Sequence, residues 1–164
     1  TSGLVADARQ LVDRARVQCQ INRITYSDVI PVDALAKRIC DFKQSFTQYG
    51  GSRPFGTALL IAGVDENDLH LYETDPSGAY QSYHAGAIGR GRNVVIDYFE
   101  NNWKPNMTLN AAIKMGLEAL RESIEAKLNK EAVEIAVVDA DGYRVLSRED
   151  TIAHIEKLKP AYDD

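Results

Sequence analysis

The feature that most constrains this fold is a change in the spacing of apolar residues near residue 57. Before it, the segments 4–23 and 32–49 carry apolar residues every three or four positions, which is the period of an amphipathic helix. After it, the run 57–64 is apolar on both faces of an extended chain, as in a strand that is covered on both sides. The sequence therefore predicts two helices, packed antiparallel because only about eight residues join them, and then a sheet.

The rest of the chain continues in pairs of like elements. It is predicted to contain strands at 69–74, 79–83 and 85–88, helices at 92–103 and 108–124, a hairpin of 133–139 and 143–146, and a last helix from 147. The strands between 57 and 88 are expected to form an antiparallel meander, with turns at 65–68 and 75–78. Paired helices and antiparallel strands favour a layered α+β fold over a doubly wound βαβ sheet.

Several residues suit the first turns of the predicted helices. Thr1 and Ser2 are predicted to cap the first helix, and Asp7 suits the positive end of its dipole. Thr108 and Ser147 are predicted to cap two later helices. The helix after Thr108 is expected to bury one face, formed by Leu109, Ile113, Gly116, Leu120 and Ile124.

The length of 164 residues fits one domain, 1–164, with a core that needs no cross-link. Apolar residues make up 45% and charged residues 26% of the chain, which excludes a disordered or collagen-like protein. The net charge of −5 arises entirely in 118–164, where 7 basic residues face 12 acidic ones. Because no basic residues cluster, we expect no nucleic-acid partner.

The two cysteines, Cys19 and Cys40, lie in predicted helices without a Cys-x-x-Cys spacing. They are interpreted as reduced thiols in or near the core, not as a disulfide or a zinc site. No segment approaches the ~18 apolar residues of a membrane span, and no leader sequence opens the chain. We therefore expect a cytoplasmic protein without a membrane partner. Because the chain starts without Met and in a helical pattern, we also expect a fragment or a processed chain.

Candidate ligand-binding residues are scattered. The turn Gly89–Asn93 joins a strand to a helix and could cradle a phosphate, but it lacks the third glycine of a dinucleotide fingerprint and the Lys of a P-loop. The alternative for this segment is a tight turn. His70, His84 and His154 are far apart, which argues against a metal site, and His70 is expected to point outward from its strand.

Candidate catalytic residues are equally dispersed. Asp75, Ser77 and the acids of 139–141 lie in predicted turns, where such side chains usually bond nearby backbone N–H groups. We therefore expect no catalytic pair, no metal and no cofactor. Aromatic side chains at loops and strand ends are either packing residues or interface anchors. They are Tyr26, Tyr49, Phe55, Tyr80, Tyr83 and Tyr98.

Five stretches of the chain together resemble one family. They are Thr1–Arg9, Tyr49-Gly50-Gly51, Arg53-Pro54-Phe55-Gly56, Leu71–Gly78 and Ala87-Ile88-Gly89-Arg90-Gly91. In order and spacing they resemble the α-type subunits of the 20S proteasome, most closely the archaeal ones. A single piece such as the Asp-Pro-Ser-Gly turn is a weak signal, whereas five pieces in register are a strong one.

The resemblance implies a four-layer αββα sandwich of the N-terminal-nucleophile hydrolase type. It implies a non-catalytic ring subunit that forms heptameric rings with other α subunits, stacks on proteolytic β subunits, and receives the C-terminal tails of regulatory ATPases or other activators. Family members carry a pore-gating tail, a helix and four strands before the position of Thr1. The resemblance therefore implies a sandwich that is incomplete at the N terminus.

The resemblance also assigns a docking site for activator tails. It places a Lys that takes the tail carboxylate ahead of Thr1, and it assigns Gly3 and Leu4, at the start of the first helix, to the same pocket. Backbone N–H groups and a helix-start dipole suit an anionic chain end. Without the Lys, we predict that this chain binds such tails weakly or not at all.

Thr1 supports an alternative, because β-type relatives use an N-terminal Thr as the nucleophile and its own amine as the base. Here Thr1 is predicted to lead into a helix, whereas in catalytic subunits it opens a strand. A free-standing N-terminal-nucleophile hydrolase acting through Thr1 is the second hypothesis. A phosphate-binding module built on Gly89–Asn93 is the third.

Overall fold

The computed structural model describes residues 1–65, 68–124 and 128–158. The predicted turn at 65–68 therefore lies partly outside the described residues. The chain divides into two compact units, Thr1–Gly89 and Arg90–Asp164, which are described one at a time as units 1 and 2. Helices and antiparallel strands make up both units, which confirms the α+β class.

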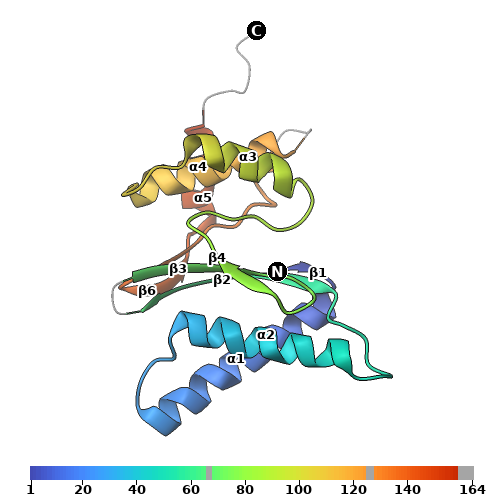
Figure 1. Ribbon diagram of the computed structural model, residues 1–164. Coiled ribbons are helices and arrows are strands. Elements are labelled where there is room, and N and C mark those ends of the chain that lie inside the picture. Colours follow the sequence, from blue (N-terminus) through green and yellow to red (C-terminus); the bar gives the residue numbers. More distant parts are fainter. Residues whose placement is uncertain (66–67, 125–127, 159–164) are drawn as a thin grey trace. The chain divides into compact units, whose positions relative to one another are not determined.

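Unit 1 consists of two long helices and a four-stranded sheet. Its elements are β1 (Ser2–Gly3), α1 (Val5–Tyr26), α2 (Val32–Gln48), β2 (Thr57–Asp65), β3 (Asp68–Thr74) and β4 (Tyr80–Ser82). The strands pair antiparallel in the order β1-β2-β3-β4. Both helices lie on the same face of this sheet (Figure 1).

The sequence correctly predicted α1, α2, β2, β3 and β4 but not the fourth strand of the sheet. Residues 85–88 form no strand, because Ala85, Gly86 and Ala87 offer little side chain to pack on a sheet. The fourth strand is β1, whose Ser2 and Gly3 pair with Ala58 and Thr57.

The predicted cap of the first helix was also wrong. Because Ser2 and Gly3 belong to a strand, neither hydroxyl of Thr1 and Ser2 caps α1. Leu4 is the N-cap residue, and no side chain caps the helix there.

The core of unit 1 lies between the helices and the sheet. Leu11 of α1, Ile39 of α2 and Leu59 of β2 are buried together with Phe55. Phe55 contacts two aromatic rings of α2, with centroid distances of 5.5 Å to Phe42 and 4.9 Å to Phe46. The Arg14 guanidinium of α1 lies 3.6 Å from the centroid of the Phe42 ring, which joins the two helices by a cation–π contact.

One edge of β2 is only partly paired in the described residues. β1 covers Thr57 and Ala58, whereas 59–65 pair with β3 alone. A groove of about 380 Å³ runs between α1 and this edge. Its lining is mostly apolar and includes Thr1, Leu11, Val12, Ala15, Cys19 and residues 59–62.

The described residues of unit 2 form three helices and one hairpin. Its elements are α3 (Arg92–Asn102), α4 (Leu109–Glu122), β5 (Ala136–Asp139), β6 (Gly142–Val145) and α5 (Arg148–Glu156). The predicted hairpin is confirmed with shorter strands. Both predicted caps are confirmed: the Thr108 hydroxyl accepts from the N–H of Ala111 at 3.3 Å, and the Ser147 hydroxyl accepts from the N–H of Asp150 at 3.0 Å.

The predicted buried face of α4 is largely wrong. The buried residues of α4 are Leu117 and Ala119, whereas Leu109, Leu120 and Ile124 are exposed. The physical reason is a groove of about 430 Å³ between α4 and residues 133–138. Leu109, Leu120 and most of the predicted stripe line this open groove.

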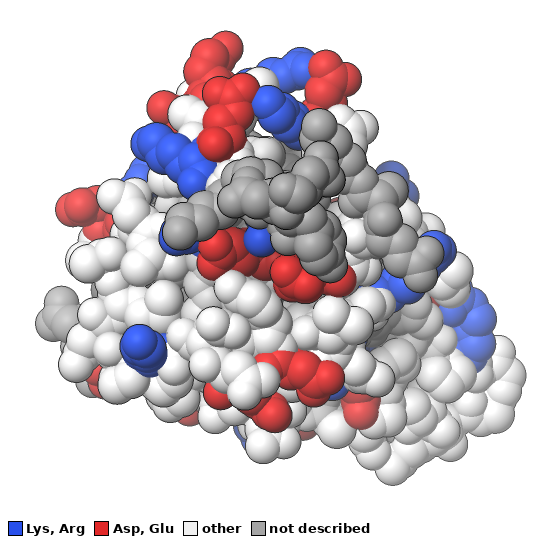
Figure 2. Space-filling view, turned by 90° about the horizontal axis from the view of Figure 1, so that it is seen from above, with Lys and Arg blue, Asp and Glu red and all other residues white. Residues whose placement is uncertain are grey.

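Charged side chains of both signs lie next to each other on the face shown in Figure 2. In unit 2, Lys130 pairs with Glu156 and Arg148 pairs with Glu131, each at 2.7 Å. In the part of the chain that the structure describes, no helix has the length and apolar character needed to span a membrane.

Candidate functional site

The candidate site is the turn of Gly3 and Leu4, where β1 ends and α1 begins. Gly3 has a φ of +124°, a conformation that side chains with a Cβ rarely adopt. A Cβ at this position would lie 2.2 Å from the carbonyl oxygen of Gly56. The close approach of these two backbone segments therefore requires glycine at position 3.

Leu4 attaches the turn to the same loop. Its N–H donates to the Gly56 carbonyl at 2.9 Å, and its own carbonyl accepts from the N–H of Ala8 to start the helix. Its side chain is 52% exposed and covers Gly56. The N–H of Leu4 is therefore already engaged, and the N–H groups of the following first turn remain the helix-start donors.

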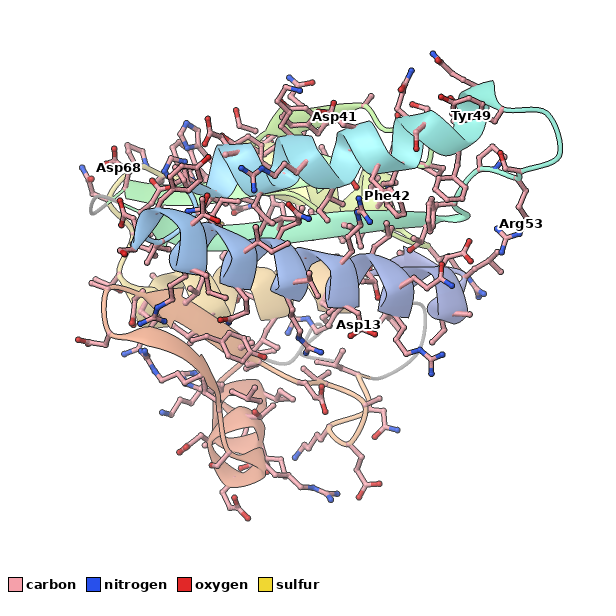
Figure 3. The ribbon with its side chains drawn as sticks, turned by 90° about the horizontal axis from the view of Figure 1, so that it is seen from below. Asp13, Asp41, Phe42, Tyr49, Arg53 and Asp68 are labelled. Carbon is pink, nitrogen blue, oxygen red and sulfur yellow. The ribbon has the colours of Figure 1, made fainter. Side chains whose placement is uncertain are left out.

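A carboxylate in the first turn of α1 organises the loop from 52 to 56. Both oxygens of Asp7 accept hydrogen bonds from Arg53, at 2.8 Å and 2.7 Å, and one of them also accepts from the N–H of Gly56 at 2.9 Å. The Asp7 side chain is buried, whereas most of Arg53 is exposed. Figure 3 shows Arg53 on the loop after α2, at the end of unit 1 where α1 begins, with Asp68 at the opposite end.

These contacts perturb both titratable groups in the expected directions. The hydrogen bonds from Arg53, followed by the one from the Gly56 N–H, lower the pKa of Asp7 to about 2. The Asp7 carboxylate in turn raises the pKa of Arg53. The pair therefore stays ionised at neutral pH and has no net charge.

This neutral pair leaves the start of α1 suitable for an anion. A helix start carries a partial positive charge, which an unpaired carboxylate in the first turn would cancel. Here Arg53 compensates the Asp7 charge, and no side chain caps the helix. The arrangement therefore leaves the backbone N–H groups of the first turn available to an anionic group.

Thr1 does not lead directly into a helix, because β1 separates it from α1. It lies at the groove between α1 and β2, whose other lining residues include Leu11, Ala15 and Leu59. None of the residues that line this groove is a histidine or a carboxylate.

The segment Gly89–Asn93, which was considered for phosphate binding, does not join a strand directly to a helix as predicted, because β4 ends at Ser82 and residues 85–88 form no strand. Gly89 and Gly91 both have positive φ, and Gly91 is the N-cap residue of α3. A Cβ on Gly91 would lie 2.9 Å from the Cβ of Ser123, so the backbone passes close to the end of α4.

His70 has a partner that the sequence did not predict. Its Nε2 lies 2.6 Å from a carboxylate oxygen of Asp65, whose other oxygen accepts from the N–H of Val32 at 2.7 Å. His70 is half-buried in this contact, so the outward orientation predicted for it was wrong. Among the described residues, no group of three or more His, Cys, Asp or Glu side chains is placed to hold a metal ion.

The aspartates in the predicted turns accept hydrogen bonds from nearby backbone N–H groups, as expected. The Asp75 carboxylate accepts from the N–H groups of Ser77 and Ala79, and that of Asp139 accepts from the N–H of Asp141. Cys19 is half-buried and Cys40 is buried, and both are free thiols.

The aromatic candidates divide into two groups. Phe55 belongs to the core of unit 1, and Tyr98 donates to Glu118 at 2.9 Å. The exposed ones are Tyr26, Tyr49, Tyr80 and Tyr83.

Sequence reasoning missed the pairing of Asp7 with Arg53, although both lie in the quoted motifs. The two residues are 46 positions apart, and a single sequence carries no signal for such a contact. The available hint was a lone basic residue between a Gly-Gly helix stop and a Pro.

Comparison with known proteins gives a consistent picture. The sequence profile described as "Proteasome subunit" matches residues 1–138. A protein named proteasome subunit alpha from Methanosarcina mazei is 50% identical over 160 residues, which are 96% of this chain and 64% of that protein. The corresponding protein of Archaeoglobus fulgidus is 52% identical over 159 residues, again 96% of this chain and 64% of the relative.

A proteasome subunit alpha from Methanopyrus kandleri is 49% identical over all 164 residues of this chain, which correspond to 67% of its own length. The chain thus spans about two thirds of the curated relatives that it matches. The family profile covers all of unit 1 and residues 90–138 of unit 2, and it includes the Gly3–Leu4 turn, Asp7 and Arg53. The chain belongs to the proteasome subunit family.

Proposed function

We propose that this chain is part of a non-catalytic α-ring subunit of the 20S proteasome core particle. The role is structural: it supports ring assembly, substrate access and the docking of activators during protein degradation. The observation that carries the proposal is the identity of about half of the residues to archaeal proteins named proteasome subunit alpha, over nearly the whole chain. We further propose a cytoplasmic location.

The proposed architecture is the four-layer αββα sandwich of the N-terminal-nucleophile hydrolases, in one domain over 1–164. Support comes from the family match, which runs across the boundary between units 1 and 2. The helix pair α1 and α2 on one face of the β1-β2-β3-β4 sheet is compatible with one outer and one inner layer.

The proposed partners are other α subunits in a heptameric ring, β subunits, and the tails of regulatory ATPases or other activators. Exposed apolar side chains on α1 support such contacts, because Val17, Ile21 and Ile24 follow one another at helical spacing. Exposed tyrosines add anchors of the kind that interfaces use, among them Tyr26 and Tyr49.

Mass in solution tests the ring proposal. We expect native mass spectrometry to detect seven or fourteen copies of the 18.2-kDa chain, or its incorporation into rings formed by a complete archaeal α subunit. A chain that stays monomeric and is also excluded from those rings would overturn the proposal.

Within this role, we propose that Gly3 and Leu4 contribute to the docking of activator tails. The positive end of α1, its lack of a side-chain cap and the neutral Asp7–Arg53 pair support the binding of a carboxylate there. We expect millimolar or weaker affinity for this chain and tighter binding by a complete subunit. Equal affinities in a titration with the same tail peptide would contradict the proposal.

The alternative is hydrolysis by Thr1. This alternative predicts that the unchanged chain hydrolyses peptides and that the Thr1→Ala variant does not. We expect the unchanged chain and the variant to be equally inactive in such an assay.

A further inference from the structure

Arg53 is connected to the Gly3–Leu4 turn by a continuous series of contacts. Its guanidinium holds both oxygens of Asp7, and Asp7 accepts from the N–H of Gly56. The carbonyl of Gly56 in turn accepts from the N–H of Leu4 at 2.9 Å. The exposed cation, the first turn of α1 and the docking turn therefore form one hydrogen-bonded unit.

The geometry of this unit needs a guanidinium. Two parallel N–H···O bonds orient the carboxylate plane, which a single ammonium group cannot do. Without Arg53, Asp7 would keep its bond to Gly56, but its second oxygen would lose its donor and its charge would be uncompensated. That charge lies in the first turn of α1, where it would oppose an approaching anion.

Asp7 and Arg53 line a common pocket beside the start of α1. This pocket of about 240 Å³ is lined by Asp7, Gln10, Phe46, Ser52, Arg53 and Phe55. Among these lining residues, only Asp7 and Arg53 carry a charge. Within this pocket, the charges of the two side chains therefore compensate each other.

We infer that Arg53 is the positioning residue of the Gly3–Leu4 docking turn: it fixes Gly56 against Leu4 through the Asp7 carboxylate, and it neutralises that carboxylate where a chain-terminal anion docks. The second half of this inference rests on the proposed docking function. The first half concerns the turn itself and does not depend on any ligand.

The first experiment follows the backbone amide signals of Leu4 and Gly56 by NMR between about pH 1 and pH 6. In the unchanged chain these signals should respond to Asp7 titration near its pKa of about 2. In Arg53→Met the midpoint should rise by about one pH unit or more, and both signals should also shift at neutral pH. The midpoint and the neutral-pH shift of Arg53→Lys should lie between those of the unchanged chain and those of Arg53→Met, because lysine restores the charge without the two parallel bonds.

The control is Lys37→Met, which breaks an exposed ion pair with Asp41 on α2. It should leave the Leu4 and Gly56 signals and their titration unchanged. A purely structural loss would instead lower the melting temperature without moving the Asp7 midpoint. If the midpoint in Arg53→Met equals that of the control, the positioning role is wrong.

The second experiment measures the affinity for an acetylated seven-residue peptide with a free α-carboxylate, with the C-terminal amide of the same peptide as the ligand control. Arg53→Met should weaken carboxylate binding about tenfold, and Arg53→Met/Asp7→Asn should recover part of the loss because it removes the uncompensated charge. If the unchanged chain binds the carboxylate and the amide with the same measurable affinity, the docking proposal fails, while the NMR titration still decides the positioning role. If Arg53→Met shifts the titration but binds the carboxylate normally, the docking half of the inference is overturned.

Discussion

The ammonium group of Lys43 donates a hydrogen bond of 3.0 Å to the hydroxyl of Thr74, which joins the middle of α2 to the end of β3. A second bond, also of 3.0 Å, goes to the carbonyl of Thr57 at the start of β2. Lys43 is 0% exposed, and both acceptors are neutral oxygens. Because burial disfavours the charged form, it lowers the pKa of Lys43, and Cys40 and Asp75 nearby oppose this shift.

Shortening this side chain is expected to destabilise unit 1. Lys43→Ala leaves a cavity and removes the donor of two oxygens, so the free energy of unfolding should fall by about 2–4 kcal/mol. Lys43→Met refills most of the volume and should recover part of this loss. Urea denaturation followed by circular dichroism measures both. The matched control is Lys37→Ala on the exposed side of the same helix, which should change stability by less than about 1 kcal/mol.

Lys43 should also make stability depend on alkaline pH. Its pKa is lowered on folding, so the unfolded chain binds more protons between the folded pKa and 10.5, and stability rises with pH in this window. The unchanged chain should therefore gain stability relative to Lys43→Met as the pH approaches 10.5. Denaturation at several alkaline pH values measures the difference, and a difference that stays constant would contradict the prediction.

Asp7 should make stability depend on acidic pH, and here too stability rises with pH. Its pKa is lowered from 3.8 to about 2, so the stability that it contributes is fully present above 3.8 and is lost as the pH falls to about 2. The unchanged chain should be more stable than Asp7→Asn at neutral pH, and this advantage should disappear across that window. Thermal melts at matched ionic strength test the effect. An advantage that persists below pH 2 would have to arise from packing alone.

Gly3 should not tolerate a side chain. Gly3→Ala places a Cβ against the Gly56 carbonyl at a φ of +124°, and we expect a loss of about 1–3 kcal/mol in the free energy of unfolding. Gly50→Ala is the control, because a Cβ there meets nothing within 4 Å. Amide exchange of Leu4 should accelerate in Gly3→Ala but not in Gly50→Ala. Equal behaviour of the two variants would mean that the turn adapts freely.

The two thiols should react at different rates. Burial raises the pKa of Cys19 and raises that of Cys40 to about 11, and Cys19 lies at the groove beside β2 whereas Cys40 is buried. At about pH 8, an aromatic disulfide reagent should modify Cys19 at least about tenfold faster than Cys40. Cys19→Ser should remove the faster phase. Two equally fast thiols would show that α2 opens readily.

The parts of the fold that have a strong local period could be predicted from the sequence. The apolar repeat of α2 gave its start at Val32 and its end within one residue of Gln48. The caps Thr108 and Ser147 were also predictable, because capping depends on residues three positions apart.

Features that depend on distant partners could not be predicted. β1 has two residues and therefore no period, and only its pairing with Thr57 and Ala58 makes it a strand. The sequence correctly showed that one face of α4 is apolar, but the spacing of apolar residues does not show whether another element covers that face. For the candidate site, Gly3 and Leu4 came from family resemblance, whereas the Arg53–Asp7–Gly56 contacts required three-dimensional coordinates.

The pairing of β1 with β2 joins segments that are made at different times. The hydroxyl of Thr57 bonds the carbonyl of Ser2 across 55 positions of sequence. At a synthesis rate of about 5–20 residues per second, roughly three to eleven seconds separate the appearance of the two partners. The residues of both long helices are synthesised before Thr57. The contacts that hold the Gly3–Leu4 turn against Gly56 and Thr57 can therefore form only after both segments have been synthesised.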